Sequence, residues 1–158
     1  MKDVTLLFLR REGQILLAMK KRGFGAGRWN GVGGKVEPGE TIRAAAIREC
    51  REEIGITPHR PQLVGELIFY EANDSSFGHH ARVFLATEWQ GEPSETEEMR
   101  PRWFDLKDIP YDQMWADDRY WLPLLLSGKY FHGSFTLDDN AVADYQLQEV
   151  TSQRTGAS

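Results

Sequence analysis

Three glutamates, Glu49, Glu52 and Glu53, lie within a five-residue stretch of the chain, a spacing that could bind a metal ion. If the stretch is helical, an advance of about 100° per residue places all three within an arc of about 100°. Like charges at such spacings repel by a few tenths of a kcal/mol per pair. One explanation is a solvated acidic face. The other is a site for Mg²⁺, which prefers carboxylate oxygens and keeps water and substrate phosphate as further ligands.

The surrounding residues predict a helix from Thr41 to Ile54, because Gly55 stands where a C-terminal glycine stop belongs. A glycine-rich loop with embedded aromatic residues, 22–34, precedes it. Arg48 is one turn before Glu52 and could hold a carboxylate in position. The carboxylates are expected to share a face away from the core, because four apolar residues project to the opposite side: Ala44, Ile47, Cys50 and Ile54.

Alternating and apolar segments predict strands before, beside and after this helix, and a second helix within 117–127 that contains Pro123. The predicted strands are 4–10, 14–20, 62–72, 81–89, 100–106, 129–137 and 142–150, with a polar loop between 72 and 81. This order predicts an α/β or α+β sandwich with a mixed sheet. We expect a single domain over 1–150 and a flexible polar tail over 151–158.

The bulk composition is ordinary for a globular protein, with 158 residues, 41% hydrophobic and 27% charged. No apolar run approaches the roughly 20 residues that cross a bilayer, so no membrane association is expected. Cys50 is the only cysteine, which excludes an internal disulfide and favours a reducing, cytoplasmic location. The net charge of −5 argues against stable nucleic-acid binding. We expect a monomer that binds a small nucleotide.

The spacing around the glutamates resembles the Nudix box: Gly34, five residues, Glu40, seven residues, Arg48-Glu49, two residues, Glu52-Glu53, one residue, Gly55. The resemblance implies a Nudix α/β/α sandwich that uses Mg²⁺, with Mn²⁺ as an alternative, to hydrolyse a nucleoside diphosphate linked to another group. It implies that Glu49, Glu52, Glu53 and the Gly34 carbonyl bind metal. Arg48 would support catalysis. Glu53 or a neighbouring carboxylate could orient or deprotonate water, and sequence alone does not separate the base from the ligands.

Two segments outside the box, "KKRGFGAGRWNG" and "WADDRYW", resemble the oxidised purine nucleoside triphosphate hydrolases of the mammalian type. This resemblance implies hydrolysis of 8-oxo-dGTP and 2-hydroxy-dATP to the monophosphate and pyrophosphate, which sanitises the nucleotide pool. The alternatives are a Nudix hydrolase for another modified nucleotide and a nucleotide sensor without turnover.

A purine pocket needs flat apolar faces and a few polar groups, and the candidate faces are Phe24, Phe69, Trp115 and Trp121. By resemblance, Asn30, Asp117 and Asp118 read the base edge. Thr5 and Lys20 map to the pocket, with Lys20 near sugar or phosphate, and Glu98 maps near the metals. Each also has a structural interpretation: the aromatics as core, the aspartates as helix caps and Asn30 as a turn residue.

The adjacent aspartates Asp117 and Asp118 could share a proton if an apolar pocket holds them close together, which would raise one apparent pKa. Glu71 departs from the resembled enzymes, because an aromatic pocket residue is expected at its position. An unpaired buried carboxylate is costly. We therefore expect Glu71 at the pocket rim, partnered by Arg82 or by water.

Overall fold

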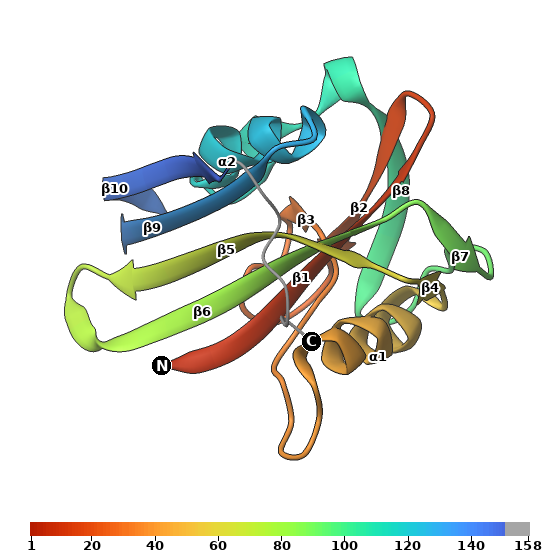
Figure 1. Cartoon of the computed structure of the whole chain (residues 1–158), viewed down its shortest axis with the longest axis horizontal. Coiled ribbons are helices and arrows are strands. Elements are labelled where there is room, and N and C mark those ends of the chain that lie inside the picture. Colours follow the sequence, from red (N-terminus) through yellow and green to blue (C-terminus); the bar gives the residue numbers. More distant parts are fainter. Residues whose placement is uncertain (151–158) are drawn as a thin grey trace.

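The computed structural model describes residues 1–150, apart from the side chains of 75–77, and the predicted tail 151–158 lies outside the described residues. Its main feature is a mixed sheet in the order β10-β9-β5-β6-β1-β2-β3, with β8 also paired to β2 (Figure 1). The pairs β1–β6 and β5–β9 are parallel and the others are antiparallel. The strands are β1 Lys2–Arg11, β2 Gln14–Lys20, β3 Trp29–Asn30, β5 Gln62–Glu71, β6 Asp74–Ala86, β8 Met99–Asp105, β9 Tyr130–Asp138 and β10 Ala141–Val150.

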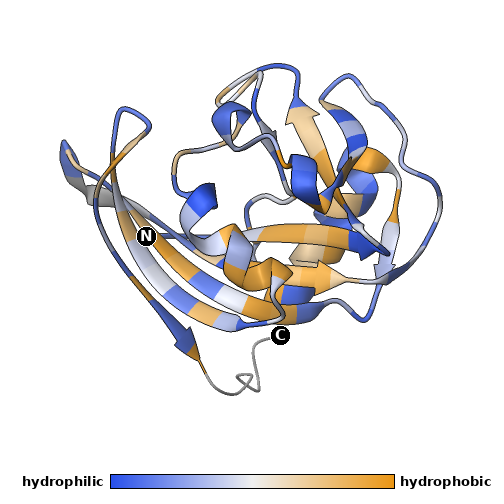
Figure 2. Cartoon of the chain, turned by 90° about the horizontal axis from the view of Figure 1, so that it is seen from above, coloured by the Kyte–Doolittle hydropathy of each residue, from blue (hydrophilic) through white to orange (hydrophobic). Residues whose placement is uncertain are grey.

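Two helices cover opposite faces of this sheet, α1 over Ile42–Ile54 and α2 over Asp118–Leu126, so the predicted sandwich is confirmed (Figure 1). A short antiparallel pair, β4 Thr57–His59 with β7 Glu88–Gln90, lies at one end. Single 3₁₀ turns, η1 Leu106–Asp108 and η2 Tyr111–Gln113, lead into α2. Hydrophobic residues run along the central strands, whereas many connecting loops are hydrophilic (Figure 2).

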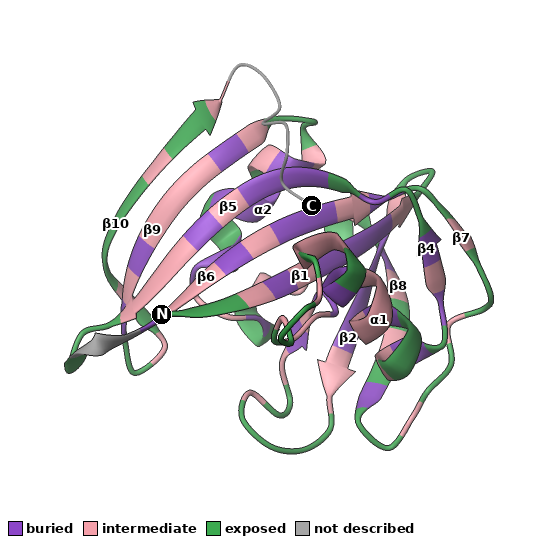
Figure 3. Cartoon of the chain, turned by 60° about the horizontal axis from the view of Figure 1, so that its bottom comes forward, coloured by how far each residue is buried: buried purple, intermediate pink, exposed green. Residues whose placement is uncertain are grey.

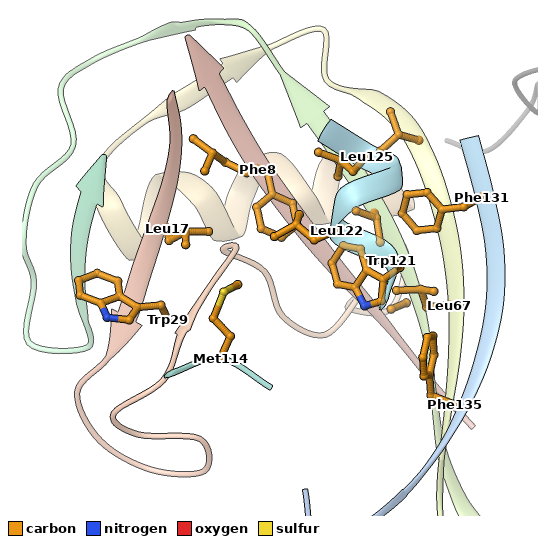
Figure 4. Close-up of a cluster of buried hydrophobic side chains, with 14 of the residues drawn as sticks. Phe8, Leu17, Trp29, Leu67, Met114, Trp121, Leu122, Leu125, Phe131 and Phe135 are labelled. Carbon is orange, nitrogen blue, oxygen red and sulfur yellow. The ribbon is translucent and has the colours of Figure 1, made fainter. Parts of the chain in front are cut away.

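Side chains along β1 alternate between the two faces, as the pleat of a strand requires. Leu7 and Leu9 belong to the core beneath α1, whereas Phe8 belongs to the core beneath α2. The α2-side core includes Trp121, which lies among Phe8, Leu122 and other apolar side chains (Figure 4). The outer strand β10 is exposed along most of its length, unlike the central strands (Figure 3). β1 therefore separates two faces of the molecule.

Helix α1 begins and ends as the sequence predicts. The Thr41 hydroxyl accepts a hydrogen bond from the Ala44 N–H at 3.0 Å, and Gly55 closes the helix in the left-handed conformation. The predicted apolar face was partly wrong: the buried residues are Ala45, Ala46, Cys50 and Ile54, whereas Ala44 is exposed. The helix is rotated from the expected orientation, and Glu49 and Glu53 are consequently half-buried.

The predicted polar loop between 72 and 81 was also wrong, because most of it forms the long β5–β6 hairpin. β6 pairs with β5 from Asp74 onward and with β1 from His79 onward. Arg82 does not pair with Glu71 as expected. Its guanidinium lies 2.6 Å from Asp3 and 3.7 Å from Glu66, and Glu71 is exposed near the hairpin end, opposite Asp74. Within residues 1–150 no helix is long and apolar enough to span a membrane.

Candidate active site

Arg48 is the central cation of a carboxylate cluster on α1. Its guanidinium donates to Glu40 at 2.6 and 3.1 Å, to Glu49 at 2.9 Å and to Glu52 at 3.2 Å. A further N–H donates to the Lys35 carbonyl at 3.1 Å, which ties the helix to the preceding loop. Glu40 also accepts a bond from the Glu37 N–H, so its contacts stabilise the junction of loop and helix. Arg48 therefore contacts two of the three glutamates that are predicted to bind metal.

Glu53 lies on the inner side of the same cluster, beside the glycine-rich loop. The Gly33 N–H donates to its carboxylate at 3.0 Å. Burial raises the pKa of Glu53 to about 7, and Glu49 and Glu52 act in the same direction, whereas the Gly33 bond and Lys20 oppose them. Close to neutral pH this carboxyl can therefore either take up or release a proton.

The Glu49 carboxylate lies against Gly34, so a larger residue at position 34 would push this carboxylate aside. A methyl group on Gly34 would be 2.6 Å from the carboxylate carbon of Glu49. Burial also raises the pKa of Glu49, which shows that negative charge is poorly solvated here. The oxygen donors and this excess negative charge fit a hard divalent cation.

The side chains as they stand are arranged around Arg48 rather than around an ion. Among residues 1–150, no group of three or more His, Cys, Asp or Glu side chains converges closely enough to hold a metal. Glu52 makes the longest of the Arg48 contacts and is the most exposed of the three glutamates, with 59% of its side chain accessible. Glu52 can therefore turn toward an ion while Glu40 and Lys35 keep Arg48 in place.

Lys20 lies at the end of β2 and acts electrostatically on both Glu53 and Glu98. Glu98 itself accepts hydrogen bonds from Arg22 at 2.5 and 2.9 Å, and this contact lowers its pKa. Lys20 therefore places positive charge near both Glu53 and Glu98. Glu98 would have to leave Arg22 before it could join a metal site.

The aspartates at the start of α2 are almost completely buried, at 3% exposure for Asp117 and 2% for Asp118. The Trp121 indole N–H donates to Asp117 at 2.7 Å. Burial, together with Asp117, raises the pKa of Asp118 well above its ordinary value, and burial also raises that of Asp117. Burial therefore disfavours negative charge on both carboxyls of the pair. One oxygen of Asp118, Oδ2, has no hydrogen-bond partner within residues 1–150.

The aromatic candidates occupy three different environments. Phe24 is 80% exposed and lies 5.2 Å from the Trp115 ring, whose other contact is the Arg28 guanidinium at 4.3 Å. Phe69 is half-buried on the α2 side and stacks on Phe135 at 6.1 Å. Trp121 is fully buried, so it positions Asp117 and has no free face for a base.

Thr5 and Asn30 are engaged in local contacts. The Thr5 hydroxyl lies 3.4 Å from both the N–H and the carbonyl of Gly34, which places Thr5 against the box loop. The side-chain amide oxygen of Asn30, Oδ1, accepts a hydrogen bond from the Gly31 N–H at 2.9 Å. Asn30 belongs to β3, where a turn was the alternative. A hollow of about 310 Å³ beside α2 is lined by none of the predicted substrate residues.

Comparison with known proteins agrees with the box geometry. The family model described as NUDIX domain matches residues 1–125. The chain belongs to the Nudix family. It is 45% identical to the "Oxidized purine nucleoside triphosphate hydrolase" of Danio rerio, over 94% of this chain and 96% of that protein. It is 47% identical to the Mus musculus protein of the same name, over 94% and 95%.

Solved structures agree with this Nudix assignment. A crystal structure described as a mutator MutT protein from Bacillus halodurans superposes with a TM-score of 0.83 at 29% identity, covering 94% of this chain and 98% of that one.

Sequence reasoning missed three supports of this Nudix site. The Gly33 N–H holds Glu53, and the adjacent glycines 33–34 were the available signal for a close backbone approach. The Thr96 hydroxyl donates to the Glu53 carbonyl at 3.1 Å and accepts from the Met99 N–H, which no local pattern indicates. Burial raises the pKa of the Tyr111 phenol, and Asp118 adds a smaller effect in the same direction.

Proposed function

We propose that this Nudix hydrolase acts on oxidised purine nucleoside triphosphates, such as 8-oxo-dGTP and 2-hydroxy-dATP. The products are the nucleoside monophosphate and pyrophosphate, and the benefit is removal of damaged precursors before a polymerase uses them. The observation that carries the substrate class is the buried Asp117–Asp118 pair, in which burial disfavours charge and one carboxyl oxygen of Asp118 has no partner among the described residues. The names of the two vertebrate relatives support the same class.

The chemistry of the pair suits an oxidised purine edge. Oxidation at the eight position gives guanine an N–H donor and a carbonyl acceptor that the ordinary base lacks. A protonated carboxyl donates one hydrogen bond, whereas an ionised one only accepts. Asp117 and Asp118 together therefore offer both functions in a site where an unsatisfied group is costly. Phe69 and Trp115 are the aromatic side chains available as flat walls.

Glu49, Glu52, Glu53 and the Gly34 carbonyl would hold Mg²⁺ or Mn²⁺, which supplies positive charge to the phosphate oxygens. Arg48 keeps Glu49 in place through a 2.9 Å contact. Glu53 is our candidate for the base that takes a proton from the attacking water, because the Gly33 N–H fixes one of its oxygens beside the box loop. Lys20 adds positive charge beside Glu53.

Glu52→Gln and Glu53→Gln test the catalytic assignment, because each removes charge while keeping shape. We expect turnover of 8-oxo-dGTP with Mg²⁺ to fall at least about 100-fold, the scale of losing a positioned catalytic group. Glu88→Gln on β7 is the matched control, since Glu88 is exposed and belongs to the distant small sheet. Near-normal turnover in both folded variants would defeat the assignment.

A nucleotide panel separates the alternatives. Wild-type protein should convert 8-oxo-dGTP and 2-hydroxy-dATP more efficiently than dGTP, with pyrophosphate as the second product. Preference for a methylated purine or a nucleoside diphosphate derivative would instead indicate another Nudix activity. Tight nucleotide binding without any product would indicate a sensor.

A further inference from the structure

Three basic side chains, Lys2, Lys35 and His79, come from separate segments and meet on one face of the sheet. Lys2 and His79 are direct partners in the parallel β1–β6 pairing. Lys35 is opposite Val4 in an antiparallel bridge between the box loop and β1. Figure 1 shows the start of β1, marked N, beside β6. We call these three residues the basic row.

Strand register places the basic row on the α2 side of the sheet, where the aspartate pair and Phe69 lie. Lys2 is two residues before Val4, so the two share a face, and Val4 packs against the α2-side core. Paired residues in neighbouring strands also share a face. His79 is paired with both Lys2 and Phe69, and Phe69 packs on that same core.

The Lys35 side chain lies on the α2 side of the sheet, because the side-chain direction of the preceding residue, Gly34, is toward the α1 side. The side-chain direction of Gly34 leads to the Glu49 carboxylate on the α1 side. The next residue in an extended segment projects oppositely. Lys35 therefore follows Gly34 directly in the sequence, but its side chain and the Glu49 carboxylate lie on opposite sides of the box loop.

The side chains of the row are close enough to influence one another. Contact with Lys35 lowers the pKa of Lys2, and burial followed by the charges of Lys2 and Lys35 lowers the pKa of His79. Glu71 is the acidic group that acts on His79 in the opposite direction. The lowered pKa favours the neutral form of His79, so the positive charge at this place comes from Lys2 and Lys35, in a chain whose net charge is −5.

This concentration matters because the catalytic face is acidic. Glu49, Glu52 and Glu53 repel a polyphosphate that approaches without a cation, and burial already disfavours charge on Glu49 and Glu53. A local basic patch can raise the association rate of a charged ligand by about 10-fold to 1,000-fold. The basic row has the sign and the position for this task.

We propose that the basic row forms an entry site for polyphosphate, in which Lys2 and Lys35 attract the triphosphate of the incoming nucleotide to the α2 face of the sheet. The entry site rests on the proposed function only for the identity of the base. Its attraction for the phosphates is independent of that function, because any base attached to a polyphosphate would be attracted. The row acts before the chemical step, so its loss should change KM and leave kcat unaltered.

Lys2→Gln/Lys35→Gln tests the entry site, with Lys107→Gln/Lys129→Gln as the matched control. Both double variants remove the same charge, but Lys107 in η1 and Lys129 after α2 are exposed outside the row. In metal-free buffer, isothermal titration with inorganic tripolyphosphate should show affinity about tenfold weaker for the first pair only. Lys2→Arg/Lys35→Arg should retain the wild-type affinity.

Kinetics then tie the site to the substrate. For 8-oxo-dGTP at low salt, kcat/KM of Lys2→Gln/Lys35→Gln should be about tenfold below wild type, and its kcat should stay within about twofold of wild type. The difference in kcat/KM should shrink as added salt screens the charges. Equal tripolyphosphate affinity in both Gln pairs would overturn the entry site. Equal weakening for the uncharged nucleoside 8-oxo-deoxyguanosine would also overturn it. If wild-type protein hydrolyses no oxidised purine but the binding difference persists, the proposed function fails and the entry site stands.

Discussion

The buried aspartate pair should make the stability of this protein fall with rising pH, and one substitution should remove that dependence. Asp118 is 2% exposed, and its pKa is raised well above the ordinary value by burial and by Asp117. An unfolded chain releases the same proton near pH 3.9, about the reference value for Asp. Between roughly pH 4 and the raised folded pKa, the folded protein therefore holds a proton that the unfolded chain has lost.

Linkage gives this difference a sign and a size. The unfolded state binds one proton fewer, so the free energy of unfolding decreases by about 1.4 kcal/mol for each pH unit in this range. The stabilisation is fully present below about pH 4 and is lost as the pH rises through the folded pKa. Asp118→Asn preserves the shape and can still donate to Asp117, but it has no proton to release. Relative to wild type, the variant should gain about 1.4 kcal/mol per pH unit.

Urea unfolding monitored by tryptophan fluorescence at about pH 4.5 and about pH 5.5 would measure the gain. Asp112→Asn is the control, because 96% of the Asp112 side chain is exposed and its ion pair with Arg119 lies at the surface. That variant should follow the wild-type pH dependence to within about 0.5 kcal/mol. A constant difference between Asp118→Asn and wild type at both pH values would show that Asp118 is ionised in the folded protein. The shared-proton argument for base recognition would then be wrong.

Two glycine substitutions test close approaches in the fold. Gly34→Ala places a methyl group 2.6 Å from the Glu49 carboxylate carbon, so turnover should fall about tenfold or more while the fold persists. Gly39→Ala is the control, because an added methyl group there has no atom within 4 Å and only the φ of +80° is unfavourable. It should cost about 1 kcal/mol of stability and leave turnover unchanged. Equal turnover in Gly34→Ala and Gly39→Ala would contradict the metal-site geometry. Gly65→Ala would place its methyl group 2.3 Å from the Phe131 ring, and urea unfolding should show a loss of about 1–3 kcal/mol. A wild-type midpoint would show that β5 can shift to make room.

The catalytic helix was predictable because its signals are local. Thr41 and Gly55 define its ends, and the box residues lie on one helix and the adjoining loop, so a correct helix brings them together. The orientation of that helix was less predictable, because it depends on Ala45 and Ala46 packing into a core built from distant strands. The half-burial of Glu49 and Glu53 follows from that packing.

The long hairpin and the substrate residues required tertiary information. Polar residues near Asn73 indicate a loop, but β6 is held between β5 and β1, and this pairing outweighs the local preference. Candidate pocket residues come from several separate elements, so their positions depend on how those elements pack. Trp121 shows the consequence, since an aromatic residue expected to face the base is fully buried and holds Asp117.

The alternation along β1 also bears on how such an enzyme can diversify. Catalytic carboxylates meet the sheet on the α1 face, and the aspartate pair and the basic row lie on the α2 face. On the proposed assignments, a substitution at Lys2 or Lys35 would change what the α2 face attracts without moving Glu49 or Glu53, whose contacts are made across the loop on the other face. Selection can therefore retune substrate choice on one face while the hydrolytic chemistry is inherited intact on the other.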